Sequence, residues 1–214
     1  MNIKKAINTY IWAIYSGLCI GVGVSVYLNM ENKIVGSFLF SVGLLSILIF
    51  GMNLFTGKVG YIVRNKPVYC LEVILTWLGN LTGTVAAAGG LKLTRNGAHL
   101  METCQPIAET KLSDSWSSLF ILGVFCGLLM FIAVDCFKKC QAEHKELMGS
   151  LLAIFIVVAF IQCGFEHSIA DMFYFALAGR LAEALPALFV ISMGNTVGGN
   201  LINIGKIIME KIEG

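Results

Sequence analysis

The sequence predicts an all-α membrane protein whose single domain, residues 1–214, crosses the bilayer six times. Of the 214 residues, 57% are hydrophobic and 13% are charged, and the mean hydropathy is +0.81, whereas soluble domains carry about 25% charged residues. The apolar residues fall into six stretches, and a pattern of glycine and asparagine occurs once in each half of the chain. We therefore expect two structural repeats of three spans each.

Each span is predicted from an apolar tract of roughly 20 residues or more, the length that crosses a bilayer. The first tract follows Lys4 and Lys5 and so begins like a signal peptide. It is longer than the usual hydrophobic region of such a peptide and no small-x-small cleavage site follows, so we predict that it is retained. The six tracts are 7–28, 34–63, 68–91, 116–134, 147–177 and 185–208.

The positive residues of the connections predict the orientation. With six spans, both termini lie on one side of the membrane. That side holds ten lysine and arginine residues, and the other side holds five. Because cytoplasmic connections carry the excess of positive charge, both termini are predicted to be cytoplasmic. The formal charge of +2 and the absence of a basic run do not indicate nucleic-acid binding.

The second and fifth tracts are too long and too interrupted for one plain helix. The second contains the run GMNLFTGK at 51–58, and the fifth contains GFEHS at 164–168. We predict a broken helix in each tract. Ionisable residues at membrane depth are costly and usually face a cavity, a partner or a transport path. Glu166 and His167 are therefore the first candidates for a functional site.

An internal repeat relates the two breaks. The run GNLTG at 79–83 returns as GNTVG at 194–198, which is 115 residues later. Applied to Asn53, this offset gives Ser168, beside the Glu-His pair. The breaks are then equivalent, and an odd number of spans per half makes the halves inverted. Transporters place such paired breaks where freed backbone groups line the substrate site.

At these residues the chain resembles the formate/nitrite transporter family. The run LFTG at 54–57 is similar to the family's second-segment loop, and GFEHSIA at 164–170 is similar to its fifth-segment signature. The two Gly-Asn-x-x-Gly runs resemble its third and sixth segments. The resemblance implies an aquaporin-like protomer in the plasma membrane of a prokaryote, a homopentamer, and one pathway per protomer for a small monovalent anion.

The resemblance also implies the residues of the pathway. His167 lies at its centre between two apolar constrictions, and Lys111, in the outer connection, attracts the anion. The chain departs from the family at Gly127, where formate channels usually carry an asparagine, and at Asn53, where a carboxylate is common. Glycine at 127 predicts a wider central chamber with one fewer donor. The matching residues of the pathway and its constrictions are Phe40, Leu44, Leu54, Thr56 and Phe160.

Desolvation is the physical problem that such a pathway must solve. An anion in an apolar slit loses its hydration without compensation, and protonation removes most of that cost. We predict that a weak acid crosses as the neutral species and exchanges its proton at His167, since histidine titrates in the right range. In the alternative, Lys111 or bulk water supplies the proton and His167 donates a hydrogen bond. Asn53, Glu166 and Asn195 are predicted to support the breaks through hydrogen bonds.

Formate is the favoured substrate, with hydrosulfide and nitrite as alternatives within the same family. Two other functional classes are open. An aquaporin-like pore for neutral solutes fits the repeat plan, although Asn-Pro-Ala pairs are absent. An intramembrane hydrolase could use Ser168, His167 and Asp171, although no nucleophile motif is present. We therefore expect no enzyme activity and no cofactor, and the seven cysteines form no zinc pattern.

Overall fold

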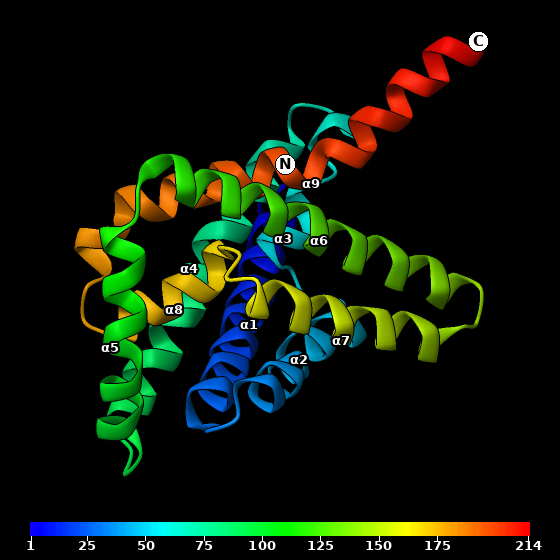
Figure 1. Ribbon diagram of the computed structural model, residues 1–214. Helices are drawn as coiled ribbons and strands as arrows, with labels where there is room; N and C mark the ends of the chain where they lie inside the picture. Colours follow the sequence, from blue (N-terminus) through cyan, green and yellow to red (C-terminus); the bar gives the residue numbers. More distant parts are fainter.

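Helices form the whole framework of the protein. The structure, a computed structural model, describes residues 1–214 and contains nine α-helices, one short 3₁₀ helix and no strand (Figure 1). The predicted all-α class is confirmed. In chain order the elements are α1 (Ile3–Asn29), α2 (Lys33–Ile49), α3 (Phe55–Val59), η1 (Ile62–Arg64), α4 (Tyr69–Lys92), α5 (Gly97–Ser113), α6 (Trp116–Ala142), α7 (Glu146–Gln162), α8 (Ser168–Leu177) and α9 (Leu181–Glu213).

Four helices, α1, α4, α6 and α9, are long and apolar enough to cross a membrane. Three further apolar helices, α2, α7 and α8, have between 10 and 17 residues. The tract at 34–63 comprises α2, α3 and η1, and the tract at 147–177 comprises α7 and α8. Each of these tracts therefore contains more than one helix.

The chain leaves the first helix of each divided tract at a glycine. Gly51, after α2, has a φ angle of 64°, and Gly164, after α7, has a φ angle of 66°. Glycine adopts this left-handed conformation without the steric cost of a Cβ atom. The chain then extends to Leu54 and His167, which are the N-caps of α3 and α8.

The two halves of the chain share one helical plan. Helices α1, α2 and α3 begin 113 residues before α6, α7 and α8, respectively. At the breaks Asn53 therefore corresponds to Glu166, and the sequence-based pairing of Asn53 with Ser168 is wrong by two residues. The offset of 115 applies to Asn80 of α4 and Asn195 of α9. The second half accordingly has two more residues between its break and its asparagine.

The close pairs α1 with α4 and α6 with α9 pack through glycines. A Cβ atom on Gly83 would lie 2.1 Å from the carbonyl oxygen of Ile14, and one on Gly198 would lie 1.8 Å from that of Val124. The backbones of the paired helices thus meet directly. Small residues permit this approach between helices in a membrane.

The connection between α4 and α6 is not the loop that the sequence predicts. Most of it forms α5, at the left edge of Figure 1, which packs against α1, α4 and α8. The Gln105 side chain donates a hydrogen bond to the Ala178 carbonyl at 3.1 Å and so ties α5 to the end of α8. Charged and apolar residues alternate irregularly along α5, so hydropathy alone did not reveal the helix.

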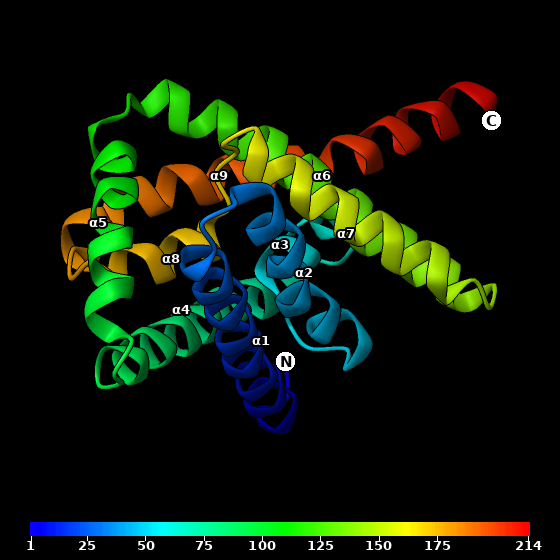
Figure 2. The same cartoon turned by 60° about the horizontal axis from the view of Figure 1, so that its bottom comes forward.

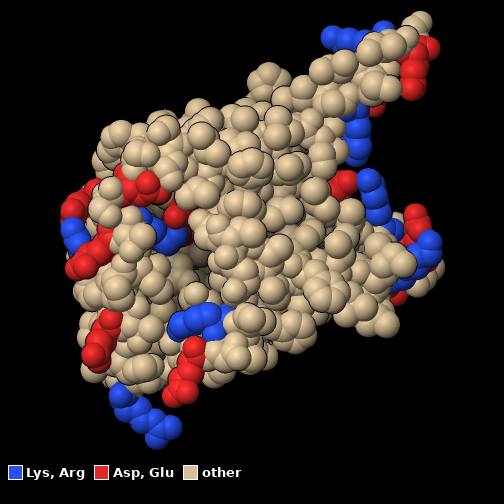
Figure 3. Space-filling model, viewed as in Figure 1, with Lys and Arg blue, Asp and Glu red and all other residues tan.

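Apolar side chains cover much of the outer surface. Phe155 and Phe189, for example, are 62% and 67% exposed. In Figure 3 the charged residues gather near α5, near the loop between α6 and α7, and on the last turns of α9, with a broad uncharged face between them. Such a surface is typical of a protein embedded in lipid. The C-terminal part of α9 extends away from the body in both ribbon views (Figures 1 and 2).

Candidate functional site

A cavity borders each break. The histidine cavity, about 160 Å³, is lined by His167 and by residues of α1, α2, α5, α7 and α8. The lysine cavity, about 150 Å³, is lined by Lys58, Lys138 and other residues of α2, α3 and α6. Seven lining positions of the lysine cavity return 113 residues later in the lining of the histidine cavity. The two cavities are therefore related by the internal repeat.

His167 is buried, with 2% of its surface exposed, and both ring nitrogens are hydrogen-bonded. The Ala170 N–H donates to Nδ1 at 3.1 Å, so Nδ1 is an acceptor and the neutral ring carries its hydrogen on Nε2. Nε2 lies 3.0 Å from Thr56 Oγ1, which accepts that hydrogen. The ring is thereby fixed as the N-cap of α8, with its N–H directed at α3.

Asn195 holds the break in which His167 lies. Its side-chain oxygen accepts a hydrogen bond from the Ser168 N–H at 3.0 Å. Its amide group donates to the carbonyl oxygens of Glu166 at 2.8 Å and Gly123 at 2.9 Å. The residues on both sides of His167 are therefore anchored by one buried side chain.

Asn80 makes the equivalent bonds at the other break. Its side-chain oxygen accepts from the Phe55 N–H at 2.9 Å, and its amide group donates to the carbonyl oxygens of Asn53 at 2.9 Å and Ala13 at 2.8 Å. Asn53 also donates from its own amide to the Thr9 carbonyl at 3.0 Å. At both breaks an asparagine from a neighbouring helix satisfies backbone groups that the interrupted helix leaves free.

Lys111 lines the histidine cavity, but its charge is not free. Its ammonium group forms ion pairs with the Glu166 carboxylate and, at 2.9 Å, with Asp171 Oδ1. Lys111 belongs to α5, which forms most of the predicted outer connection, and its ion pairs tie this helix to α8. The prediction that Lys111 attracts the anion did not include this pairing with two carboxylates. Glu166 supports the break by accepting the hydrogen bond of Lys111.

Asp171 is a site residue that the sequence placed only in the hydrolase alternative. It is 1% exposed, lines the histidine cavity, and has one oxygen, Oδ2, without a hydrogen-bond partner. The 113-residue offset relates Asp171 to Lys58, which lines the lysine cavity. The hydrolase arrangement is absent: Ser168 Oγ has no partner, and both His167 nitrogens are bonded elsewhere.

Two aromatic residues predicted for the constrictions lie together in the histidine cavity. The rings of Phe40 and Phe160 have centroids 6.0 Å apart and are nearly perpendicular, at 86°. Phe160 also stacks on His167, with centroids 5.7 Å apart. Leu44 is buried and lines neither cavity. The aromatic pair therefore forms an apolar wall on the side of the histidine.

A thin layer separates the two cavities. Leu54 lines the lysine cavity. Thr56, two residues further along the chain, is fully buried and is bonded to His167 of the histidine cavity. Two residues of extended chain span at most about 7 Å. The polar contact between Thr56 and His167 thus lies between the two cavities.

Gly127 does not line either cavity. A Cβ atom there would lie 2.2 Å from the Asn195 carbonyl oxygen, in the contact between α6 and α9. Gly17 makes a similar close contact between α1 and α4, because a Cβ atom there would lie 2.3 Å from the Asn80 carbonyl oxygen. The predicted role of Gly127 in widening the central chamber is wrong, because the missing side chain permits helix packing.

Comparisons with known proteins agree with the resemblance. The sequence model of the family described as "Formate/nitrite transporter" matches residues 2–208. The nitrite transporter NirC of Escherichia coli is 27% identical over 229 residues, covering 93% of this chain and 82% of that protein. The formate channel FocA of Escherichia coli is 25% identical over 246 residues, covering 93% of this chain and 85% of that protein.

Solved structures share the fold. A pentameric formate channel with formate bound has a TM-score of 0.78 at 22% identity, covering 99% of this chain and 100% of that chain. An FNT family ion channel has a TM-score of 0.72 at 24% identity, covering 92% of this chain and 86% of that chain. The family match extends over nearly the whole sequence, and four helices are apolar enough to cross a bilayer. This integral membrane protein therefore belongs to the formate/nitrite transporter family.

Proposed function

We propose that this protein is a channel for a small monovalent weak-acid anion, with formate as the favoured substrate and nitrite and hydrosulfide as alternatives. The relatives named as nitrite transporter and formate channel support this substrate class. The pathway joins the two cavities through the layer that contains Leu54, Thr56 and His167. The observation that carries the proposal is the buried His167, fixed by hydrogen bonds in the layer between two repeat-related cavities.

The proposed membrane arrangement has six spans in two inverted repeats. The spans are α1, α2 with α3, α4, α6, α7 with α8, and α9, and both termini are cytoplasmic. The equal offset of α1 to α3 and α6 to α8 supports two repeats, and an odd number of spans per repeat makes them inverted. We propose a homopentamer, which accords with the pentameric formate channel of the same fold. Light scattering on the purified protein measures the number of protomers.

The anion crosses the apolar walls as the neutral acid. A bare anion beside the apolar wall formed by Phe40 and Phe160 would lose hydration without an opposite charge to compensate. Proton exchange through His167 would require a hydrogen on Nδ1, which faces the Ala170 N–H donor. The hydrogen bonds therefore favour the second route: bulk water supplies the proton, and the Nε2–H of His167 orients the acid.

Substitutions at His167 test the pathway and distinguish the routes. Proteoliposomes containing His167→Phe are expected to lose uptake of formate while the assembled oligomer persists. His167→Asn retains a neutral donor and is expected to keep part of the uptake, whereas a route through imidazolium would lose all of it. His144→Phe is the matched control, because His144 has 93% of its side chain exposed. Wild-type uptake by His167→Phe would refute the proposed pathway.

A pore for neutral solutes is the second candidate, favoured by the apolar wall that Phe40 and Phe160 form in the histidine cavity. Fluxes of formate, nitrite, hydrosulfide, water and glycerol in the same proteoliposomes separate the two functions. An anion channel carries the weak acids and excludes glycerol. Glycerol flux equal to formate flux would support the neutral-solute pore instead.

A further inference from the structure

The geometry points to an anion-binding site in the lysine cavity, formed by the ammonium groups of Lys58 and Lys138 in front of Leu54. Its ligand is a small monovalent anion, either inorganic or a short carboxylate. The inference rests on the proposed function in one respect: the site loads the same pathway that leads to His167. Its existence as a binding site does not depend on which weak acid crosses.

The two lysines reach the cavity from different helices. Lys58 extends from α3 and Lys138 from α6, and both line the cavity with Leu54. The Lys138 ammonium lies 4.7 Å from the ring centroid of Tyr61 and has no carboxylate within 4.0 Å. The nearby Asp135 is bound by Lys139 at 2.7 Å. Lys138 is therefore an unpaired cation at the wall of a cavity.

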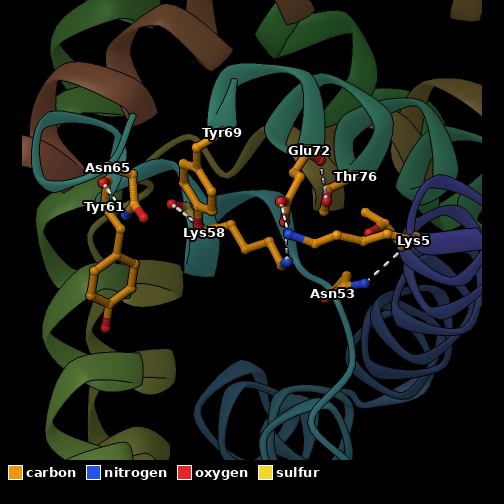
Figure 4. A network of polar contacts seen from close by, with 9 residues as sticks. Lys5, Asn53, Lys58, Tyr61, Asn65, Tyr69, Glu72 and Thr76 are labelled. Atoms are coloured by element: carbon orange, nitrogen blue, oxygen red, sulfur yellow. Dashed lines mark hydrogen bonds and ion pairs between the residues drawn. The ribbon is translucent and has the colours of Figure 1, made fainter. Parts of the chain in front are cut away.

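The positive charge of Lys58 is only partly neutralised, because its carboxylate partner is shared with another lysine. Its ammonium lies 3.8 Å from Glu72 Oε2, while the other oxygen of Glu72 is bound by Lys5. Figure 4 shows both ammonium groups directed at this one carboxylate. Lys5 and Lys58 thus share the single carboxylate of Glu72. Lys138, which lines the same cavity as Lys58, adds a third ammonium group without a carboxylate partner. An anion between Lys58 and Lys138 balances the remaining positive charge.

At the histidine cavity, negative charges outnumber positive charges. There, one ammonium group, that of Lys111, faces the two carboxylates of Glu166 and Asp171. Cavities lined by charges of one sign concentrate ions of the other sign. Of the two repeat-related cavities, the lysine cavity is therefore the one that collects anions, immediately before the apolar side chain of Leu54.

Bromide is a suitable probe because it is small, monovalent and not protonated in water, so it occupies the site without crossing as an acid. Bromide is expected to inhibit formate uptake into proteoliposomes competitively. Lys58→Gln and Lys138→Gln should each raise the bromide inhibition constant about threefold or more, because each removes one of two attracting charges. Glu72→Gln should lower the constant, since it releases Lys58. Lys145→Gln, an exposed lysine paired with Glu143, should leave it unchanged.

Lys58→Arg controls for misfolding, because it retains the charge and should retain most of the bromide inhibition. Anomalous diffraction from crystals soaked in bromide gives a readout that does not depend on transport. The expected result is a bromide peak between the two ammonium groups in the wild type and its loss in Lys138→Gln. A wild-type protein that shows this peak but carries no weak acid refutes the proposed function and not the site. Normal formate uptake, with no peak and equal inhibition constants in all variants, overturns the site.

Discussion

Replacing Asn195 with alanine should remove the hydrogen bonds that hold the backbone on both sides of His167. The side chain of Asn195 is completely buried and makes three hydrogen bonds of 2.8 to 3.0 Å. Alanine leaves the Ser168 N–H and the Glu166 carbonyl without their partner. The Gly123 carbonyl is affected less, because a carbonyl inside a helix also accepts from the N–H four residues on.

The magnitude follows from these groups. An orphaned buried donor or acceptor costs about 1–3 kcal/mol, so two of them predict about 2–6 kcal/mol. Hydrogen bonds measured in membrane proteins average about 0.6 kcal/mol and reach about 1.7, so three bonds predict about 2–5 kcal/mol. The two estimates agree on a loss of about 2–5 kcal/mol in the free energy of unfolding. For a chain of this size, about 2–4 °C per kcal/mol gives a fall in Tm of at least about 4 °C.

Thermal unfolding of the solubilised protein and formate uptake by proteoliposomes measure the effect. The matched control is Asn203→Ala on the same helix, because Asn203 donates one buried hydrogen bond, to the Gly60 carbonyl at 2.8 Å, and does not contact the histidine break. Asn195→Ala should lose more stability than Asn203→Ala and should lower uptake per folded protomer. Equal Tm values and equal uptake in the two variants would refute the reasoning.

Three further predictions follow from the packing, the buried charges and the proposed crossing of the neutral acid. Gly127→Ala should lower the yield of assembled protein, its Tm and its free energy of unfolding, the last by about 1–3 kcal/mol or more, because the added methyl group would overlap the Asn195 carbonyl. Gly205→Ala faces open space and should change none of these quantities. Lys111→Ala should cost about 3–5 kcal/mol in an unfolding measurement because it leaves two buried carboxylates without their cation, while Lys145→Ala at an exposed pair should have little effect. Raising the pH should slow formate uptake and leave water flux unchanged, and equal formate uptake across the pH range would show that the ion itself crosses.

Features that follow from local chemistry could be predicted from the sequence. The apolar tracts gave the helix-rich membrane class, because bilayer-spanning helices require long runs of apolar residues. The glycines near 51 and 164 marked positions where a helix can end in a left-handed residue. Asn80 and Asn195 were visible as a repeated polar residue in an apolar context, although their bonding partners lie far away in the chain.

Features that depend on tertiary contacts could not be predicted. Gly127 packs against the backbone of α9, and nothing in the neighbouring sequence distinguishes this position from one that lines a cavity. Lys111 lies 55 residues before its partner Glu166, so its ion pairs were not visible from sequence spacing. The wrong partner of Asn53 has a simpler cause: the offset of 115 residues holds at Asn80 and Asn195 but not at the breaks, because two additional residues follow the second break.

The two repeats carry opposite charges at one equivalent position. The fourth residue of the helix after each break is Lys58 in α3 and Asp171 in α8. Both residues line their cavities, so the symmetric backbone carries opposite charges toward the two ends of the proposed pathway. Fixed charges of this kind change how often an anion occupies each cavity and how fast it loads. They do not change the final distribution across the membrane, which the gradients of the anion and of protons set, so the asymmetry affects the rates of a passive channel and not its direction.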